Sequence, residues 1–562
     1  MMRRLGQLGL LACAWGCGES GAASPPVDPG LLDVAELPLL RVYGPPGSGE
    51  RGTPIAGGKD IDGDGHADFV VASFLGTPPA RDGVGRTSAG IAAIVFGNGE
   101  LTGEVDASVP GRRVLHVYGT NLAETAGNEI WLDDVTGDGL ADVLIGRQNF
   151  APDLASGEFP GAVSVLAGGA ELRTLSGGVL ELGAPGIATV TTLLGDADGD
   201  RLGVWFRSGD IDADGTADLV LGADQVSRGT DTHQGAAYAL RGGAWLGSGG
   251  TLRLADAPAG NFAELSVESI PAEAHLGATC QLADLDTDGH ADAIVAATID
   301  RAGAGVPPDG AHSKLTHPSG GVEHGAVWFF PGQAIASAWQ AGTRTTLASG
   351  SLRGDDKGVR FGEEIVGLGD INGDAQADLF LGDIVGGGAG SILRPRAGTA
   401  HVVFSAAELL SGDHQLEQLR SAGRLFEVVG AQGGDITGDT AVAGDFDGDG
   451  VADVAIASPH ASRSGRNFAG MVHVIFGGQR FPALLDLAAP NAPELRWEQL
   501  LGAHGNDGLG QGDILGYSAA SADLDGDGIT DLMLNEMTGD GPAGVDTGNL
   551  VVISGRALRS EP

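Results

Sequence analysis

The sequence predicts an all-β fold: a seven-bladed β-propeller of four-stranded antiparallel blades, closed by an N-terminal strand that completes the last blade. The first observation is an aspartate-rich nonapeptide that occurs seven times, beginning at residues 60, 134, 210, 284, 370, 445 and 523. The second is a set of glycine-bounded apolar runs at similar places in every period. The third is a content of 98 glycines in 562 residues, which favours many tight turns over long helices.

The nonapeptide defines the repeat. Its copies read DIDGDGHAD, DVTGDGLAD, DIDADGTAD, DLDTDGHAD, DINGDAQAD, DFDGDGVAD and DLDGDGITD, and successive copies begin 74 to 86 residues apart. Self-similarity at such a period is typical of a repeat architecture.

Each period contains four strand-like segments. One leads into the aspartate loop and one leaves it, as in DFVVAS from residue 68. A third is a glycine-bounded apolar run such as AGIAAIVFG, and a fourth precedes most motifs, as in RVLHVYG, TLRLAD, RLFEVVG and LRWEQLLG. Short runs of β-branched and aromatic residues between glycines are typical of strands. Four antiparallel strands repeated seven times indicate a propeller, in which blades bury their faces against one another.

The two ends of the repeat region complement each other. The last period stops at NLVVISGRALRSEP, after three strands, whereas LLRVYG near the N-terminus resembles a fourth strand without the preceding three. We therefore expect Leu39 to Tyr43 to complete the seventh blade beside Leu550 to Ile553, which would remove the open edge of the ring.

The aspartate loop predicts a site for a hard cation. Positions 1, 3, 5 and 9 carry oxygen side chains, and the backbone carbonyl at position 7 can supply a fifth oxygen. This donor set suits Ca²⁺ better than Mg²⁺, which retains waters, or Zn²⁺, which prefers His and Cys. An EF-hand sensor is excluded because position 12, where that loop needs a bidentate Glu, is apolar in all seven copies. Another cation, or a catalytic acid cluster, remains as an alternative, although seven near-identical clusters are typical of a scaffold.

We predict up to seven structural Ca²⁺ ions and no catalytic residues. Thr136 and Asn372 replace aspartate at position 3, so the second site, with only a hydroxyl there, is expected to be the weakest. The predicted ligands, with position 7 acting through its carbonyl, are Asp60, Asp62, Asp64, His66, Asp68, Asp134, Thr136, Asp138, Leu140, Asp142, Asp210, Asp212, Asp214, Thr216, Asp218, Asp284, Asp286, Asp288, His290, Asp292, Asp370, Asn372, Asp374, Gln376, Asp378, Asp445, Asp447, Asp449, Val451, Asp453, Asp523, Asp525, Asp527, Ile529 and Asp531.

These motifs resemble a known family. The segment GDIDADGTADLVLGA followed by GAAYALRGG, and the segment RFGEEIVGLGDINGDAQADLFLGD with Phe361 and Gly362, are similar to the FG-GAP repeat of the integrin α-subunit propeller and its bacterial relatives. The Gly-Ala-Pro element is replaced by GAD or ASP in other copies. The resemblance covers residues 38–557. It implies seven blades with calcium in the loop between the first and second strands of a blade, and it assigns the ligand role to the positions named above.

The N-terminus predicts export. Residues 1–17 combine two arginines, an apolar run from Leu5 to Trp15 and two cysteines, Cys13 and Cys17, as in a signal peptide of lipoprotein type. Ordinary secretion and a cytosolic chain are the alternatives. We expect a flexible linker over 18–37, the propeller over 38–557 and a tail over 558–562. The protein is then an outer-membrane or cell-surface lipoprotein, or secreted, and meets a membrane only through its lipid anchor.

The formal net charge of −42 argues against nucleic acid as a partner. We find no nucleophile elbow, HExxH motif or phosphate-binding loop and predict no enzyme. The expected function is binding or adhesion to a protein or glycan on the face opposite the calcium loops. The alternatives are a carbohydrate-active enzyme, a polysaccharide lyase or hydrolase, or a structural component of the envelope. The longest interval, from Asp292 to Gly325, contains His312, Lys314, His317 and His324 and is either a ligand-contacting flap or a solvated insertion.

Overall fold

The computed structural model describes residues 31–558, apart from 46–53, 82, 156, 184–188, 230–231, 259, 269, 271–272, 298–314, 317–321, 324, 356–359, 491, 507–511, 543 and 545–546. The expected signal peptide and most of the expected linker lie outside the described residues. So do His312, Lys314, His317 and His324 of the expected flap.

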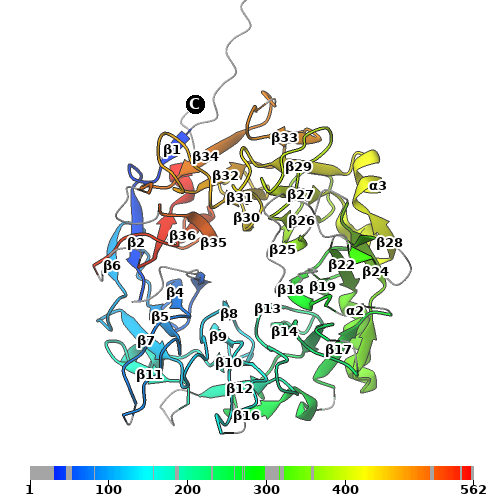
Figure 1. Ribbon diagram of the computed structural model, residues 1–562. Coiled ribbons are helices and arrows are strands. Elements are labelled where there is room, and N and C mark those ends of the chain that lie inside the picture. The colour runs from blue at the N-terminus through cyan, green and yellow to red at the C-terminus, as the bar shows by residue number, and fades with distance from the viewer. Residues whose placement is uncertain are drawn as a thin grey trace, which may run out of the picture.

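Seven five-stranded sheets surround a central axis (Figure 1). The innermost strands lead into the aspartate loops: β3 (Ile55–Lys59), β8 (Ile130–Asp133), β13 (Phe206–Gly209), β18 (Leu276–Ala283), β25 (Phe361–Gly369), β30 (Ala441–Gly444) and β35 (Leu515–Ala522). The second strands leave these loops: β4 (Asp68–Ser73), β9 (Asp142–Arg147), β14 (Asp218–Ala223), β19 (Asp292–Ala297), β26 (Asp378–Asp383), β31 (Asp453–Ser458) and β36 (Asp531–Glu536).

The remaining strands lie progressively farther from the axis. The third strands are β5 (Ile91–Val95), β10 (Ala162–Leu166), β15 (Ala236–Leu240), β22 (Ala326–Phe330), β27 (Thr399–Val403), β32 (Met471–Ile475) and β37 (Asn549–Ile553). The fourth are β7 (Val114–Tyr118), β12 (Val190–Leu194), β17 (Phe262–Ser266), β24 (Gly350–Arg353), β29 (Leu425–Val429), β34 (Trp497–Leu501) and β2 (Leu39–Tyr43). The fifth are β11 (Val179–Glu181), β16 (Gly250–Arg253), β23 (Thr345–Leu347), β28 (Gly412–Gln415), β33 (Leu484–Asp486), β1 (Leu31–Asp33) and β6 (Gly103–Asp106).

The prediction of four strands per blade was wrong. Six of the fifth strands come from the connection between the third and fourth strands of the following blade, and β1 comes from the segment before β2. Each of the seven pairs parallel with the fourth strand of its host. The segment TLRLAD accordingly contributes β16 to the second blade, and the fourth strand of the third blade is β17. Each blade is therefore hydrogen-bonded to a segment of its neighbour.

The N-terminal segment joins the two ends of the chain. Strand β2 pairs antiparallel with β37, with Leu39 opposite Ile553 and Tyr43 opposite Asn549, which is where the sequence placed it. Strand β1 pairs parallel with β34 of the sixth blade. Figure 1 shows these blue strands among the orange and red strands of the last two blades.

Short helices lie in the connections. They are α1 (Ala170–Thr174), α2 (Gly332–Ala341) and α3 (Leu416–Ser421), with 3₁₀ turns η1 (Leu254–Asp256), η2 (Ala406–Leu410) and η3 (Gly555–Leu558). A small hairpin pairs β20 (Leu315–Thr316) with β21 (Val322–Glu323). Within the described part of the chain, none of the helices has the length and apolar character that crossing a membrane requires.

The core lies between blades. One cluster joins Val70 and Leu115 of the first blade to Ile130 and Val143 of the second, and similar clusters follow around the ring. The apolar residues at positions 2 and 12 of the aspartate motif, such as Ile61 (0% exposed), are buried in every copy. The loops therefore begin and end in the core, which fixes their position on one face.

A buried ion cluster in the fifth blade is expected to stabilise the folded state. The Glu427 carboxylate accepts hydrogen bonds from Arg420 Nε and Nη2 (both 2.9 Å) and from His401 Nδ1 (3.0 Å). Burial raises the pKa of Glu427, but the hydrogen bonds from Arg420 and His401 outweigh it and hold the pKa at about 2. The pKa in the folded state is therefore below the ordinary value of about 4.5. The charged carboxylate stabilises the folded state fully above pH 4.5, and this stabilisation is lost as the pH falls towards 2.

The variant Glu427→Gln is expected to lose about 3 kcal/mol of unfolding free energy at pH 7. The difference from wild type should narrow in urea denaturation as the pH falls from 4.5 towards 2. The matched control is Glu417→Gln, which removes a 68%-exposed partner of the same arginine and should change stability by less than about 1 kcal/mol. Equal effects of the two substitutions at pH 7 would contradict the prediction.

Candidate functional site

The aspartate loops share one backbone conformation. The carboxylate at position 1 accepts the N–H of position 6 at 2.7–3.0 Å in all seven loops. The carboxylate at position 5 accepts the N–H of position 7 in the same way. Position 6 has positive φ, 87° at Gly65 and 65° at Ala375, and so favours glycine. The predicted ligand positions therefore lie on seven equivalent turns on one face.

The aspartate at position 9 anchors the loop. Asp68 is fully buried, and its two oxygens accept N–H groups from Ile61 (2.8 Å) and from Gly97 after the third strand (2.7 Å). All seven copies repeat this pattern. Burial raises the pKa of Asp68 to about 7 against the opposing effect of these hydrogen bonds. Position 9 thus ties three strands of a blade together, in addition to any role as a ligand.

Three of the five predicted ligand positions converge in four of the loops. In the first, third, fourth and sixth loops, ligand oxygens from positions 1, 3 and 9 lie within 4.8 Å of one another. In the second loop, Thr136 Oγ1 instead donates to Asp142 Oδ1 (3.3 Å). At position 7, the His290 ring contacts the Ile211 carbonyl of the preceding loop (2.8 Å), so its side chain faces away from the carboxylates. A set of converging carboxylate oxygens fits a hard divalent cation.

Arginines that the sequence analysis missed contact four of these loops. They bind the carboxylates at position 3, position 5 or both. The pairs are Arg173 with Asp62 and Asp64, Arg241 with Asp212 and Asp214, Arg496 with Asp447 and Asp449, and Arg556 with Asp527. They offset part of the negative charge of the loops. Arg173 also joins two blades, because it lies on α1 of the second blade and reaches the loop of the first.

Neighbouring loops are hydrogen-bonded to each other. The Ala141 N–H donates to the Asp60 carbonyl of the preceding loop (2.9 Å), and the Ala291 N–H donates to the Asp210 carbonyl (2.8 Å). The same contact joins Ala217 to Asp134 and Thr530 to Asp445. Each of these four loops is therefore attached through its backbone to the loop of the preceding blade.

The opposite end of the axis holds a cavity of about 330 Å³. Residues at or near the beginnings of six of the seven innermost strands line it. Because these strands run towards the aspartate loops, their first residues lie at the other face of the ring. We call this cavity the channel mouth.

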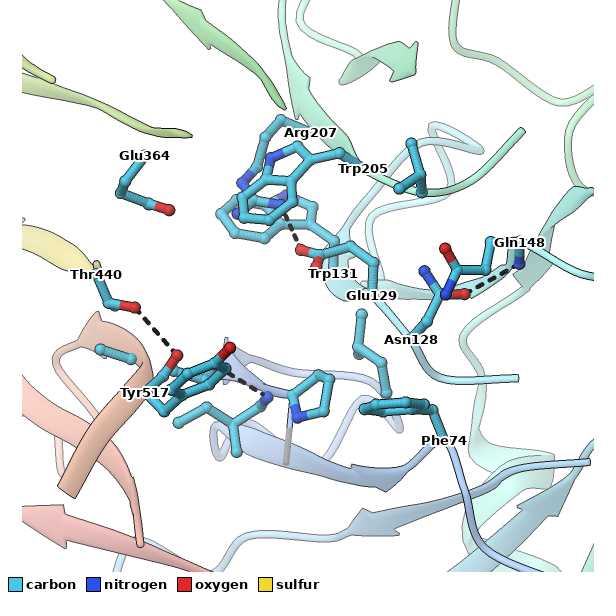
Figure 2. Close-up of a pocket in the computed structure, with 16 residues that line it drawn as sticks. Phe74, Asn128, Glu129, Trp131, Gln148, Trp205, Arg207, Glu364, Thr440 and Tyr517 are labelled. Carbon is cyan, nitrogen blue, oxygen red and sulfur yellow. Dashed lines mark hydrogen bonds and ion pairs between the residues drawn. The ribbon is translucent and has the colours of Figure 1, made fainter. Parts of the chain in front are cut away.

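A stacked arginine dominates the channel mouth. The Arg207 guanidinium carbon lies 4.5 Å from the ring centroid of Trp131 and 4.6 Å from that of Trp205. Its Nη1 donates to Glu129 Oε1 at 2.5 Å, as Figure 2 shows. Trp131 Nε1 in turn donates to Ser208 Oγ (2.7 Å). Stacking and ion pairing together fix the orientation of the guanidinium.

Acidic and phenolic groups complete the channel mouth. Figure 2 shows Glu364 and Thr440 across the cavity from Arg207, with Tyr517 beside Thr440. The charge of Asp439, and then burial, raise the pKa of Tyr517 to about 12. Burial raises the pKa of Glu364 well above its ordinary value. Burial also raises the pKa of Glu129, where Arg207 opposes the effect.

No sequence motif marks the channel mouth. The available signal was variation: the residue five places before each aspartate motif differs between most repeats, and several of these residues line the cavity. The seven residues at this position are Ile55, Glu129, Trp205, Thr279, Ile365, Thr440 and Ser518, and all of them except Thr279 and Ile365 line the cavity.

The FG-GAP repeat matches residues 202–240 and 437–475. Among solved structures, the biofilm matrix protein Bap1 of V. cholerae is similar over 94% of this chain and 90% of its own, at 10% identity and a TM-score of 0.31. The exotype rhamnogalacturonan lyase YesX is similar over 93% and 76%, at 11% identity and a TM-score of 0.33. Neither similarity bears on the function of this chain. No curated protein matches the sequence significantly.

Proposed function

We propose that the chain is a calcium-stabilised binding module displayed outside the cell, because two of its segments match the FG-GAP repeat and its seven sheets form a propeller. Its ligand, a protein or a glycan, binds at the channel mouth, on the face opposite the aspartate loops. The apolar run from Leu5 to Trp15 and the cysteines Cys13 and Cys17 support export, with lipid attachment at one of the cysteines.

The aspartate loops are proposed to hold up to seven Ca²⁺ ions. Positions 1, 3, 5 and 9 would supply side-chain oxygens and position 7 its carbonyl. The ion would neutralise carboxylates that otherwise repel one another. Outside the cell, millimolar calcium fills sites of modest affinity.

The observation that carries the binding proposal is the stack of Arg207 between Trp131 and Trp205. Trp131 and Trp205 are half-buried, and aromatic side chains with fixed polar partners provide large contact area at little cost in conformational entropy. The surrounding glutamates and Tyr517 supply acceptors and donors that can orient a polar ligand. A cavity of about 330 Å³ lies within the range of sites for small ligands or for a protruding side chain or sugar.

The test is a screen of glycans and surface proteins with the intact protein, in calcium and in chelator. Wild type should bind a ligand in calcium, and Trp205→Ala should weaken binding by at least about tenfold. The control is Phe159→Ala, which removes a 40%-exposed aromatic side chain outside the channel mouth. Absence of binding under every condition, or equal binding by both variants, would contradict the proposal.

A second candidate is a polysaccharide lyase or hydrolase. It is favoured by Glu129 and Glu364, two carboxyl groups in one cavity with unlike surroundings: Glu129 is paired with Arg207, whereas Glu364 has no ion-pair partner among the described residues. The enzyme hypothesis predicts that the wild-type protein cleaves a polysaccharide and that Glu364→Gln abolishes turnover while retaining binding. Binding without turnover on acidic and neutral polysaccharides would exclude it.

A further inference from the structure

Two histidines and a glutamate meet between the third and fourth blades. His233 lies in the connection between β14 and β15, and Glu273 and His275 lie in the connection between β17 and β18. Both connections are on the face opposite the aspartate loops. One ligand atom from each of these three residues lies within 4.8 Å of the others.

The distances suit a tetrahedral metal ion. Glu273 Oε2 lies 3.0 Å from His233 Nδ1 and 3.9 Å from His275 Nε2. Zinc–ligand bonds of about 2.1 Å at tetrahedral angles separate ligand atoms by about 3.4 Å, between these two values. Thr232 Oγ1 donates to the other oxygen, Oε1, of Glu273 and so leaves Oε2 directed at the histidines.

The buried imidazole of His275 is the strongest evidence for a metal site. The residue is only 6% exposed, and its Nε2 has no hydrogen-bond partner although it is buried. Its Nδ1 lies 3.1 Å from the Asp224 carbonyl. Because a carbonyl can only accept, Nδ1 carries a proton, and in the neutral imidazole Nε2 then carries the lone pair that a metal ion needs. Metal-binding histidines typically donate their second ring N–H to a carbonyl or carboxylate in this way.

The fold itself does not require histidine at these places. The His275 N–H donates to the His233 carbonyl (3.1 Å), and the same backbone contact recurs in two other seams between blades. There it joins Thr125 to Ser88 (3.1 Å) and Ile514 to Phe468 (3.0 Å). The backbone contact is therefore general to the ring, whereas the imidazoles are specific to this seam.

We propose that His233, Glu273 and His275 form a three-ligand site for a transition-metal ion of the Zn²⁺ class. The His233 and Glu273 side chains are 41% and 37% exposed, so the ion can enter from solvent. A fourth coordination position then faces solvent for water or a ligand group, as in three-ligand zinc sites. This site is separate from the aspartate loops, whose oxygen-only donors favour calcium.

The test is titration of Zn²⁺ into the full chain in excess Ca²⁺, which keeps the aspartate loops filled. We expect one Zn²⁺ per chain. His275→Gln and Glu273→Gln should each weaken Zn²⁺ binding by at least about 100-fold, because loss of a ligand exceeds the 10–100-fold effect of an outer-shell partner. His233→Gln, at an exposed side chain, should do the same with an unchanged melting curve, which guards against loss of folding at the buried His275.

Two controls locate the site. His504→Gln removes a 70%-exposed histidine elsewhere and should leave Zn²⁺ binding unchanged. A triple variant with glutamine at His312, His317 and His324 should also retain it. No Zn²⁺ binding by wild type, equal binding by His233→Gln and wild type, or loss of binding in the triple variant would each overturn the proposal.

Discussion

Removal of calcium with a chelator is expected to lower the melting temperature by about 10 °C. A site that is filled tenfold above its Kd stabilises the folded state by about 1.4 kcal/mol, so seven such sites contribute about 10 kcal/mol. A chain of this length loses about 1 °C of melting temperature per kcal/mol. The measurement is calorimetry of the same preparation with Ca²⁺ and after chelation.

The stabilisation of the folded state by bound calcium is expected to be cooperative around the ring. Hydrogen bonds such as that from Ala141 to Asp60 join successive loops, so loss of one ion disorders the edge of the next blade. Asp286→Asn, at position 3 of the fourth loop, should therefore reduce the effect of chelation by more than the share of one site. Asp256→Asn, at an exposed aspartate outside the loops, is the control and should leave the effect unchanged. An unchanged wild-type melting curve after chelation would refute structural calcium.

The periodic features of the fold could be predicted from the sequence because each is local. The aspartate motif places four ligand positions within nine residues, and its flanking apolar residues, such as Ile61 and Val71, identify two buried strands. The fifth strands gave no such signal. Strand β11 has only three residues, and Val179 within it is 42% exposed, so neither length nor alternation distinguishes it from a loop.

Sites formed between repeats could not be predicted in the same way. Arg207 meets Trp131 of another blade, one repeat (76 residues) earlier in the sequence, and nothing in the local pattern around either residue indicates that the two side chains meet. The contact between Arg173 and Asp62 and that between His233 and His275 also join residues that are distant in the sequence. Their proximity is produced by the curvature of the ring, which brings together the ends of neighbouring strands, and it becomes visible only in three dimensions.

The second large loss of stability is expected when β2, the strand that joins the two ends of the chain, is disrupted. Val42 in β2 is fully buried and lies opposite Leu550 of β37. It belongs to a core cluster that also contains Ile55 and Phe69 of the first blade. An aspartate at this position would bury an unpaired carboxylate at the seam between the last blade and the first. Val42→Asp is therefore expected to cost more than about 4 kcal/mol of unfolding free energy.

The matched control is Val109→Asp, which places the same charge on a side chain that is 55% exposed and should cost less than about 0.5 kcal/mol. Urea denaturation measures both. Displacement of β2 would also leave β37 as an open edge, and open edges promote pairing between chains, so Val42→Asp should elute partly as multimers in size-exclusion chromatography. Equal stability of the two variants would mean that the ring holds together without β2. Because β2 supplies the fourth strand of the seventh blade and packs on the first, we instead expect both blades to lose protection from proteolysis together.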